Sequence, residues 1–118
     1  MPAVGGPFDA DAGRARVDFV LGDAHGRSAA PGIVAAVEGR LRSLGYSVRR
    51  NAPYSGGFIT RSYGRPEKGV HALQIEINRG LYMDETQLRL NAGFVPLAAD
   101  LERLMSFVAG IEPARAAA

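Results

Sequence analysis

The fold is decided by the stretch His71-Ala72-Leu73-Gln74-Ile75-Glu76-Ile77-Asn78. Within it the apolar residues Leu73, Ile75 and Ile77 alternate strictly with polar residues. Successive side chains of an extended strand point to opposite faces, so this alternation predicts a β-strand with one apolar face and one polar face. The polar face carries Gln74, Glu76 and Asn78.

Two further strands and a helix are predicted upstream of this stretch. Residues 16–22 (RVDFVLG) are apolar on both faces, which is typical of a buried strand in a parallel sheet, and residues 46–50 (YSVRR) form the next strand. The helix between them is expected to be capped by Ser28, to carry Pro31 in its first turn and to end at Gly45. Its apolar stripe consists of Ile33, Val34, Val37, Leu41 and Leu44. Together these elements form a β-α-β unit.

The remaining segments complete the prediction of an α/β fold. Residues 51–69 read as a long loop, residues 96–109 as a helix, residues 1–14 as a loop arm and residues 112–118 as a frayed tail. We expect a partial three-layer α/β sheet in a single domain, residues 1–118. Three strands leave exposed edges and an uncovered sheet face, so the chain is expected to be part of something larger or to pair with a partner.

Composition narrows the classes of function. The chain has 118 residues, 47% of them hydrophobic and 22% charged, as in an average globular domain. It contains no cysteine, which excludes a disulfide scaffold, a thiolate zinc site and a cysteine nucleophile. The net charge of +2 is dispersed, so no nucleic-acid partner is expected. Neither a membrane span nor a signal peptide is recognisable, which favours a cytoplasmic protein.

Glu76 is the first candidate for chemistry. It sits near the carboxyl end of an apolar strand, where open α/β sheets place their ligands. A carboxylate between Ile75 and Ile77 is costly to bury unless it is paired or hydrogen-bonded. One interpretation is therefore an ion pair with Arg79 or another arginine at a strand end, and the other is a general base with a raised pKa.

The loop Asn51-Ala52-Pro53-Tyr54-Ser55-Gly56-Gly57-Phe58-Ile59-Thr60 is the second candidate. Its glycine pair permits close approach to a ligand and exposes backbone N–H donors. Hydroxyls come from Tyr54 and Thr60, and Arg79 is a cation suited to holding a carboxylate. The alternative is a glycine-rich turn with aromatic residues packed over the sheet.

The two histidines do not form a metal motif. His25 and His71 are far apart in the sequence and have no carboxylate at a ligand spacing. We therefore predict no metal ligand in this chain. Ser28 has no histidine and acid arranged around it beyond His25, which disfavours a serine triad.

Three segments taken together resemble the C-terminal half of the N-formylglutamate amidohydrolase family. They are VDFVLGDAHGRSA (17–29), RRNAPYSGGFITRSYGRP (49–66) and GVHALQIEINRGLYMDE (69–85). The resemblance covers about residues 1–85, and an NxPYxGGxIT loop before a QIEINRxLYM strand is quite specific.

The resemblance implies a fold like that of the zinc carboxypeptidases and hydrolysis of N-formyl-L-glutamate to formate and glutamate, as in histidine breakdown. In such proteins a zinc ion activates water and a strand glutamate acts as general base. That glutamate corresponds to Glu76. The substrate loop corresponds to Asn51, Tyr54, Gly56, Gly57 and Thr60. Arg79 is expected to hold a substrate carboxylate or to orient Glu76.

The sequence departs from the family at its beginning. Family metal ligands lie upstream, the last of them a histidine in an Asp-x-His-Ser-Met-Pro stretch, whereas this chain begins Met1-Pro2. We therefore expect a truncated member that lacks the zinc ligands. The chain would then be inactive alone, or active with a missing N-terminal half or through self-association. A third hypothesis is a non-catalytic module that binds an amino-acid carboxylate.

Overall fold

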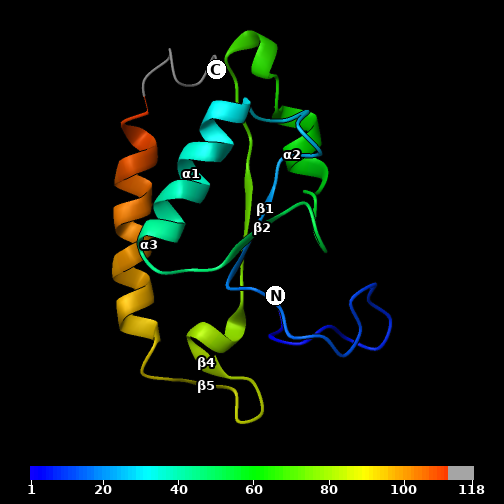
Figure 1. Ribbon diagram of the computed structural model, residues 1–118, viewed down its shortest axis with the longest axis vertical. Helices are drawn as coiled ribbons and strands as arrows, with labels where there is room; N and C mark the ends of the chain where they lie inside the picture. Colours follow the sequence, from blue (N-terminus) through cyan, green and yellow to red (C-terminus); the bar gives the residue numbers. More distant parts are fainter. Residues whose placement is uncertain (112–118) are drawn as a thin grey trace.

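A three-stranded sheet lies at the centre of the computed structural model, which describes residues 1–111 (Figure 1). The strands are β1 (Phe19–Gly22), β2 (Val48–Arg50) and β3 (Gln74–Ile77), in the order β2-β1-β3. The predicted tail, residues 112–118, lies outside the described residues. All of β1 is buried, as its two-sided apolar pattern predicts. Helix α1 (Pro31–Ser43) connects β1 to β2, and the two strands pair in parallel. The α/β class and the β-α-β unit are confirmed.

The sheet is mixed, so the prediction of a parallel sheet is wrong for β3. β3 runs antiparallel to β1, with Gln74 opposite Gly22 and Glu76 opposite Val20. Residues 51–73 connect β2 to β3, and β3 begins at the edge of the sheet where β1 and β2 end. The amino end of β3 therefore lies beside the carboxyl ends of the other two strands. This corrects the placement of Glu76 at the ligand-binding carboxyl edge, because Gln74 is nearer to that edge.

The main core lies on one face of the sheet, under α1 and α3 (Phe94–Ala109), which run side by side in Figure 1. Phe19 and Leu21 point into this layer, and Tyr46 packs edge-on against Phe19 with ring centroids 4.9 Å apart. The predicted helical stripe is confirmed at its central positions. The buried cluster consists of Phe19, Leu21, Ala29, Val34, Val37, Leu41, Val48, Leu97 and Leu104.

The start of α1 differs from the prediction. The N-cap residue is Ala30, Pro31 is the first helical residue, and no side chain caps the helix from the N-cap position. Ser28 is buried, and its hydroxyl donates to the carbonyl of Ala72 at 2.8 Å. The N–H of Ala30 instead donates to His71 Nδ1 at 3.0 Å. The hydrogen bond at the start of α1 thus comes from His71, in the segment before β3, and not from Ser28.

Short elements escaped the sequence analysis. The predicted loop 51–69 contains the six-residue helix α2 (Phe58–Tyr63) and the 3-10 helix η1 (Pro66–Lys68). After β3 come the 3-10 helix η2 (Arg79–Leu81) and a hairpin of β4 (Met83–Asp84) and β5 (Arg89–Leu90). None of these spans enough residues to display an amphipathic repeat.

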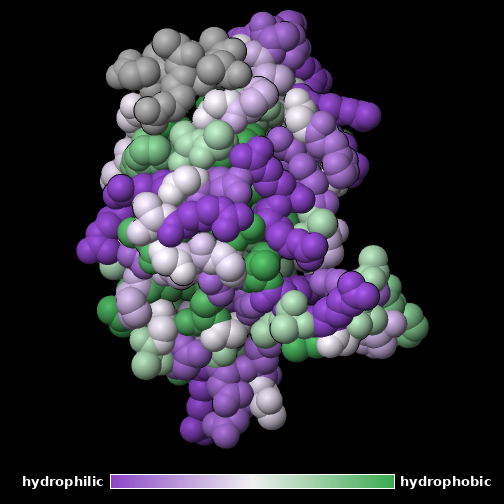
Figure 2. Space-filling view, viewed as in Figure 1, coloured by the Kyte–Doolittle hydropathy of each residue, from purple (hydrophilic) through white to green (hydrophobic). Residues whose placement is uncertain are grey.

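The arm, residues 1–14, projects from the body as an ordered loop (Figures 1 and 2). Arg16 holds it, because its Nε lies 2.8 Å from Asp11 Oδ2 and its Nη2 lies 2.7 Å from Asp9 Oδ2. These hydrogen bonds, with that of Asp11 the stronger, raise the pKa of the buried guanidinium. The arm is therefore tied to a residue that lies three positions before the start of β1.

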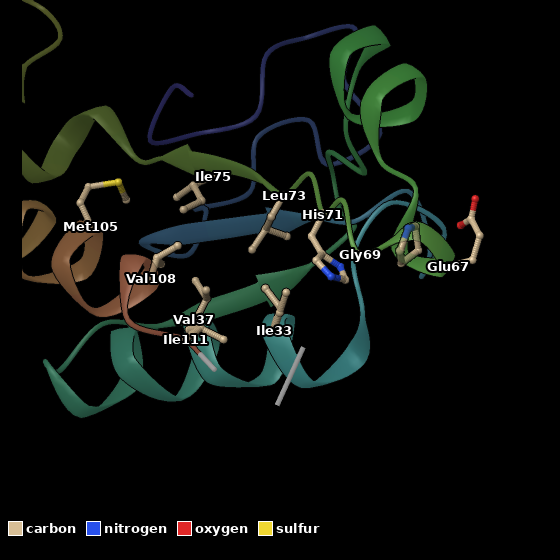
Figure 3. A pocket seen from close by; sticks show the side chains of 11 residues that line it. Ile33, Val37, Glu67, Gly69, His71, Leu73, Ile75, Met105, Val108 and Ile111 are labelled. Atoms are coloured by element: carbon tan, nitrogen blue, oxygen red, sulfur yellow. The ribbon is translucent and has the colours of Figure 1, made fainter. Parts of the chain in front are cut away.

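An apolar groove of about 760 Å³ lies beside β3 on the face that carries the helices. Figure 3 shows Leu73 and Ile75 of the β3 segment facing residues of α1 and α3 across it. The lining includes Ile33, Val37, Met105 and Val108, with His71 and Glu67 at one end. Leu73 and Ile75 are only half-buried, which agrees with the expected uncovered sheet surface. Within residues 1–111 no helix combines the length and apolarity needed to cross a bilayer.

Candidate functional site

Glu76 lies on the polar face of β3, on the opposite side of the strand from the groove. Its side chain is 32% exposed. Its Oε1 accepts a hydrogen bond from Gln74 Nε2 at 3.0 Å, and its Oε2 forms an ion pair with the N-terminal ammonium group of Met1 at 3.8 Å. The alternative of an ion pair with Arg79 is wrong, because Arg79 Nε lies 3.1 Å from Glu85 Oε1. Glu76 is thus hydrogen-bonded to a neutral amide, and the cation beside it is the N-terminal ammonium group rather than an arginine.

Gln74 connects Glu76 to the glycine loop, residues 51–57. Its Oε1 accepts the backbone N–H of Gly57 at 3.1 Å while its Nε2 donates to Glu76. Residues 74 and 76 share one face because of the two-residue period of the strand. One side chain therefore places the carboxylate and the loop at a fixed spacing, which brings the two predicted candidates together.

The glycine loop is held against the carboxyl end of β1. The N–H of Ala24 donates to Ser55 O at 2.7 Å. A Cβ on Gly22 would lie 2.6 Å from the backbone nitrogen of Gly56, so a glycine is required there for the loop to approach this closely. Gly56 itself has φ +110°, and a Cβ on it would lie 2.9 Å from Thr60 Cγ2. Strand and loop are therefore packed backbone against backbone.

Two loop residues have structural partners that the sequence did not reveal. Asn51, at φ +59°, donates from Nδ2 to Asp23 Oδ1 at 2.8 Å and accepts the N–H of Asp23 at 3.1 Å. Its amide thus shapes the turn after β1. Tyr54 presents its ring to the Arg16 guanidinium, with Cζ 5.3 Å from the ring centroid. That contact links the loop to the residue that holds the arm.

The predicted site residues therefore fall into three groups. Glu76, Gly56 and Gly57 lie around Gln74, and the buried Thr60 packs closely against Gly56. Asn51 fixes the start of the loop through Asp23, and Tyr54 contacts Arg16 from the middle of the loop. Arg79 follows the far end of β3, away from the loop, and its backbone N–H donates to Met1 O at 2.9 Å. The N–H of Gly57, expected to be free for a ligand, is taken by Gln74.

The two histidines have different surroundings. His71 accepts a hydrogen bond from Ala30, and His25 is exposed on the turn after β1. Among residues 1–111, no three His, Cys, Asp or Glu side chains gather as a metal site. A zinc ion of the kind the family resemblance implies therefore does not fit the donors that this part of the chain presents.

Sequence reasoning missed Gln74 and Arg16 as organising residues. The signal for Gln74 was available, because the strand alternation placed it two residues before Glu76 on the same face. No comparable signal marked Arg16, whose partners depend on the path of the arm. Chemically, the arrangement presents a partly exposed carboxylate that Gln74 orients through one oxygen and connects to the glycine loop, with the N-terminal ammonium group near the other oxygen.

Comparison with known proteins gives consistent matches. A family profile described as N-formylglutamate amidohydrolase matches residues 1–83. An N-formylglutamate deformylase of Pseudomonas aeruginosa is 45% identical over 69 residues, covering 58% of this chain and 26% of that protein. One from Pseudomonas putida is 41% identical over 71 residues, covering 59% of this chain and 27% of that protein. The chain thus spans about a quarter of the length of these curated relatives.

A solved structure shares the fold. The crystal structure of N-formylglutamate amidohydrolase from Ralstonia eutropha superposes with a TM-score of 0.76 at 41% sequence identity. The superposition covers 88% of this chain and 38% of that one.

Proposed function

This chain belongs to the N-formylglutamate amidohydrolase family, and from that premise we propose that it provides the general base and the substrate loop of an amide hydrolase. The proposed substrate is N-formyl-L-glutamate or a related N-acyl amino acid, and the products are formate and glutamate. The absence of cysteine fits a reducing compartment such as the cytoplasm, where amino-acid breakdown, including that of histidine, takes place.

The observation that carries the proposal is the link from Glu76 through Gln74 to Gly57. It holds a proton acceptor beside a backbone loop that is shaped before any ligand arrives. Because the loop is fixed to β1 through Ala24 and Gly22, a bound substrate would meet little rearrangement. Half-exposure of Glu76 leaves its carboxylate accessible to water.

The proposed proton transfers use Glu76 alone. Its carboxylate takes a proton from a water molecule as that water attacks the formyl carbon. The resulting carboxylic acid then gives the proton to the leaving nitrogen, which departs as the amine of glutamate. One water is consumed and one C–N bond is broken, and Glu76 returns to its ionised state.

Zinc is part of the proposal only as a component from elsewhere. The donors of residues 1–111 do not fit it, so no step above is routed through a metal. A metal would need ligands in addition to those that residues 1–111 of one chain present, from an N-terminal half, from a second copy of the chain or from a separate chain.

The test is formate release from N-formyl-L-glutamate by the 118-residue chain, with and without added Zn²⁺. Glu76→Gln keeps the shape of the side chain and the acceptor for Gln74 but removes the base. We expect turnover to fall by about 10²- to 10⁴-fold. The matched control is Glu102→Gln on the exposed surface of α3, which should retain parental turnover. Equal rates for parent and Glu76→Gln would remove the general-base assignment.

The fixed glycine loop also supports a second candidate, a non-catalytic module that binds an amino-acid carboxylate. Hydrogen bonds that involve Asp23, Ser55 and Gln74 shape the loop, and these contacts would serve a binding site as well as a catalytic one. Calorimetry with N-formyl-L-glutamate separates the two functions. Saturable heat without formate release favours the binding module, whereas turnover that depends on Glu76 favours the hydrolase.

A further inference from the structure

We propose that Gln74 is a positioning residue that fixes the orientation of the Glu76 carboxylate relative to the glycine loop. The catalytic part of this inference rests on the proposed hydrolase function. The geometric part stands on the hydrogen bonds of Gln74 and can be tested without turnover.

The orientation of the Gln74 amide follows from its two neighbours. The backbone N–H of Gly57 can only donate, so the atom 3.1 Å from it must be the acceptor Oε1. A flipped amide would bring the NH₂ group against that N–H. The NH₂ end therefore faces Glu76, 3.0 Å from Oε1. Since NH₂ can only donate, this carboxylate oxygen must accept, as an ionised Glu76 does.

The two carboxylate oxygens of Glu76 have different neighbours. Oε1 accepts from the Gln74 amide at 3.0 Å, and Oε2 forms an ion pair with the N-terminal ammonium group of Met1 at 3.8 Å. That ammonium group donates its hydrogen bond to Ile77 O at 2.8 Å. The hydrogen bond that orients the carboxylate is therefore the one from Gln74.

Gln74 is itself held from both sides, which makes it an effective spacer. Its backbone is paired with Gly22 of β1, and the loop that contains Gly57 is fixed to the same end of β1 through Ser55. Rotation of the Gln74 side chain would break the Gly57 contact. The carboxylate is therefore aligned with the loop by a chain of contacts that ends on rigid backbone.

Gln74→Met keeps the length of the side chain and removes both hydrogen bonds. The proposal predicts a fall in kcat of about tenfold to a hundredfold with KM little changed, because the base loses alignment while the loop remains. The matched control is Gln87→Met on the exposed β4–β5 turn, which should keep parental kcat and KM.

Gln74→Glu provides a readout that a purely structural role would not move. When the pair of carboxyls at 74 and 76 shares one proton, the new acid can accept from Gly57 and donate to Glu76, as the amide does. When that proton is lost, two negative charges face each other and the alignment is destroyed. The pH profile of kcat should therefore shift toward acid, with activity lost as the pH rises. A parental pH profile in Gln74→Glu would overturn the proposal, even if Gln74→Met fails to fold.

Amide hydrogen exchange tests the geometry separately from the function. In Gln74→Met the Gly57 N–H loses its acceptor and should exchange on the order of tenfold faster, whereas Gln87→Met should leave it unchanged. Parental Gly57 exchange in Gln74→Met overturns the positioning link. If the unmutated chain releases no formate, only the proposed hydrolase function is refuted. The hydrogen-exchange result then decides whether Gln74 holds the loop.

Discussion

The two faces of β3 are stabilised by different kinds of interaction. On one face, Leu73, Ile75 and Ile77 pack against the shared core, and Leu73 and Ile75 also border the apolar groove. On the other face, each polar side chain has specific partners. Gln74 joins Gly57 and Glu76, and Asn78 donates to Arg16 O at 3.1 Å while accepting from the N–H of Gly80 at 2.9 Å.

This difference teaches where the strand tolerates change. Burial of apolar area is non-directional, so the helix-bearing face responds to the volume of its side chains. Hydrogen bonds have narrow distance and angle ranges, so the polar face responds to displacements of less than an ångström. Changes to the first face should mainly alter stability, and changes to the second should mainly alter the site.

The largest expected effect comes from breaking the apolar face at Phe19. This fully buried residue lies opposite Ile77 in the sheet and packs against Tyr46. Phe19→Ala should destabilise the fold by about 3–5 kcal/mol, because it removes a large side chain from a core that cannot close around the cavity. Chemical denaturation of the purified chain measures the loss. Phe8→Ala removes the same atoms from a fully exposed position on the arm and should cost almost nothing. Equal losses at the two positions would refute the placement of the core.

A smaller effect, directed at the polar face, is expected from Gly22→Ala. The added methyl would lie 2.6 Å from the backbone nitrogen of Gly56 and 2.7 Å from Ser55 C, so the loop must move away from β1. We expect a loss of about 1–3 kcal/mol and faster hydrogen exchange at Gly57.

Gly39→Ala is the matched control for that prediction. Gly39 is exposed on α1 with open space around an added Cβ, and alanine there should be neutral or stabilise by up to about 1 kcal/mol. Unchanged Gly57 exchange in Gly22→Ala would contradict the close strand–loop contact.

Much of the fold could be predicted from sequence because its long elements repeat a pattern. The alternation of residues 71–78 and the stripe from Val34 to Leu41 each sample their period several times. The direction of β3 could not be predicted, because it depends on the path of residues 51–73 and not on any pattern within the strand. α2 and the β4–β5 hairpin were missed for want of length.

The candidate site was predictable in its members and less so in its connections. The strand pattern and the glycine pair marked Glu76 and the glycine loop as candidates, and the family resemblance gave them roles. Alternation also placed Gln74 on the same face as Glu76. The structural task of Asn51 arises from a contact with Asp23, 28 residues away in sequence, which no local pattern encodes. Arg79 was misplaced because charge complementarity alone could not distinguish Glu76 from Glu85 as its partner.

The smallest expected effect concerns the hydrogen bonds between Arg16 and the carboxylates of the arm. Hydrogen bonding from Arg16 holds the pKa of Asp11 below its ordinary value of 3.8, against a weaker opposing effect of desolvation, and the charge of Arg14 adds to the lowering. A carboxyl with a lowered folded-state pKa contributes stability above its unfolded pKa and loses it as the pH falls through the folded value. The arm should therefore keep its structure from neutral pH down to about pH 4 and loosen below that.

The backbone amide of Gly13 reports this transition, because it donates to Gly5 O at 3.0 Å within the arm. In Asp11→Asn the acid-dependent change in its NMR shift should shrink, while the midpoint of thermal unfolding changes little because the arm lies outside the core. Asp84→Asn, on the exposed β4–β5 hairpin, is the control and should keep the parental transition at Gly13. Persistence of that transition in Asp11→Asn would show that Asp9 alone holds Arg16. One carboxylate rather than two would then hold the arm to Arg16.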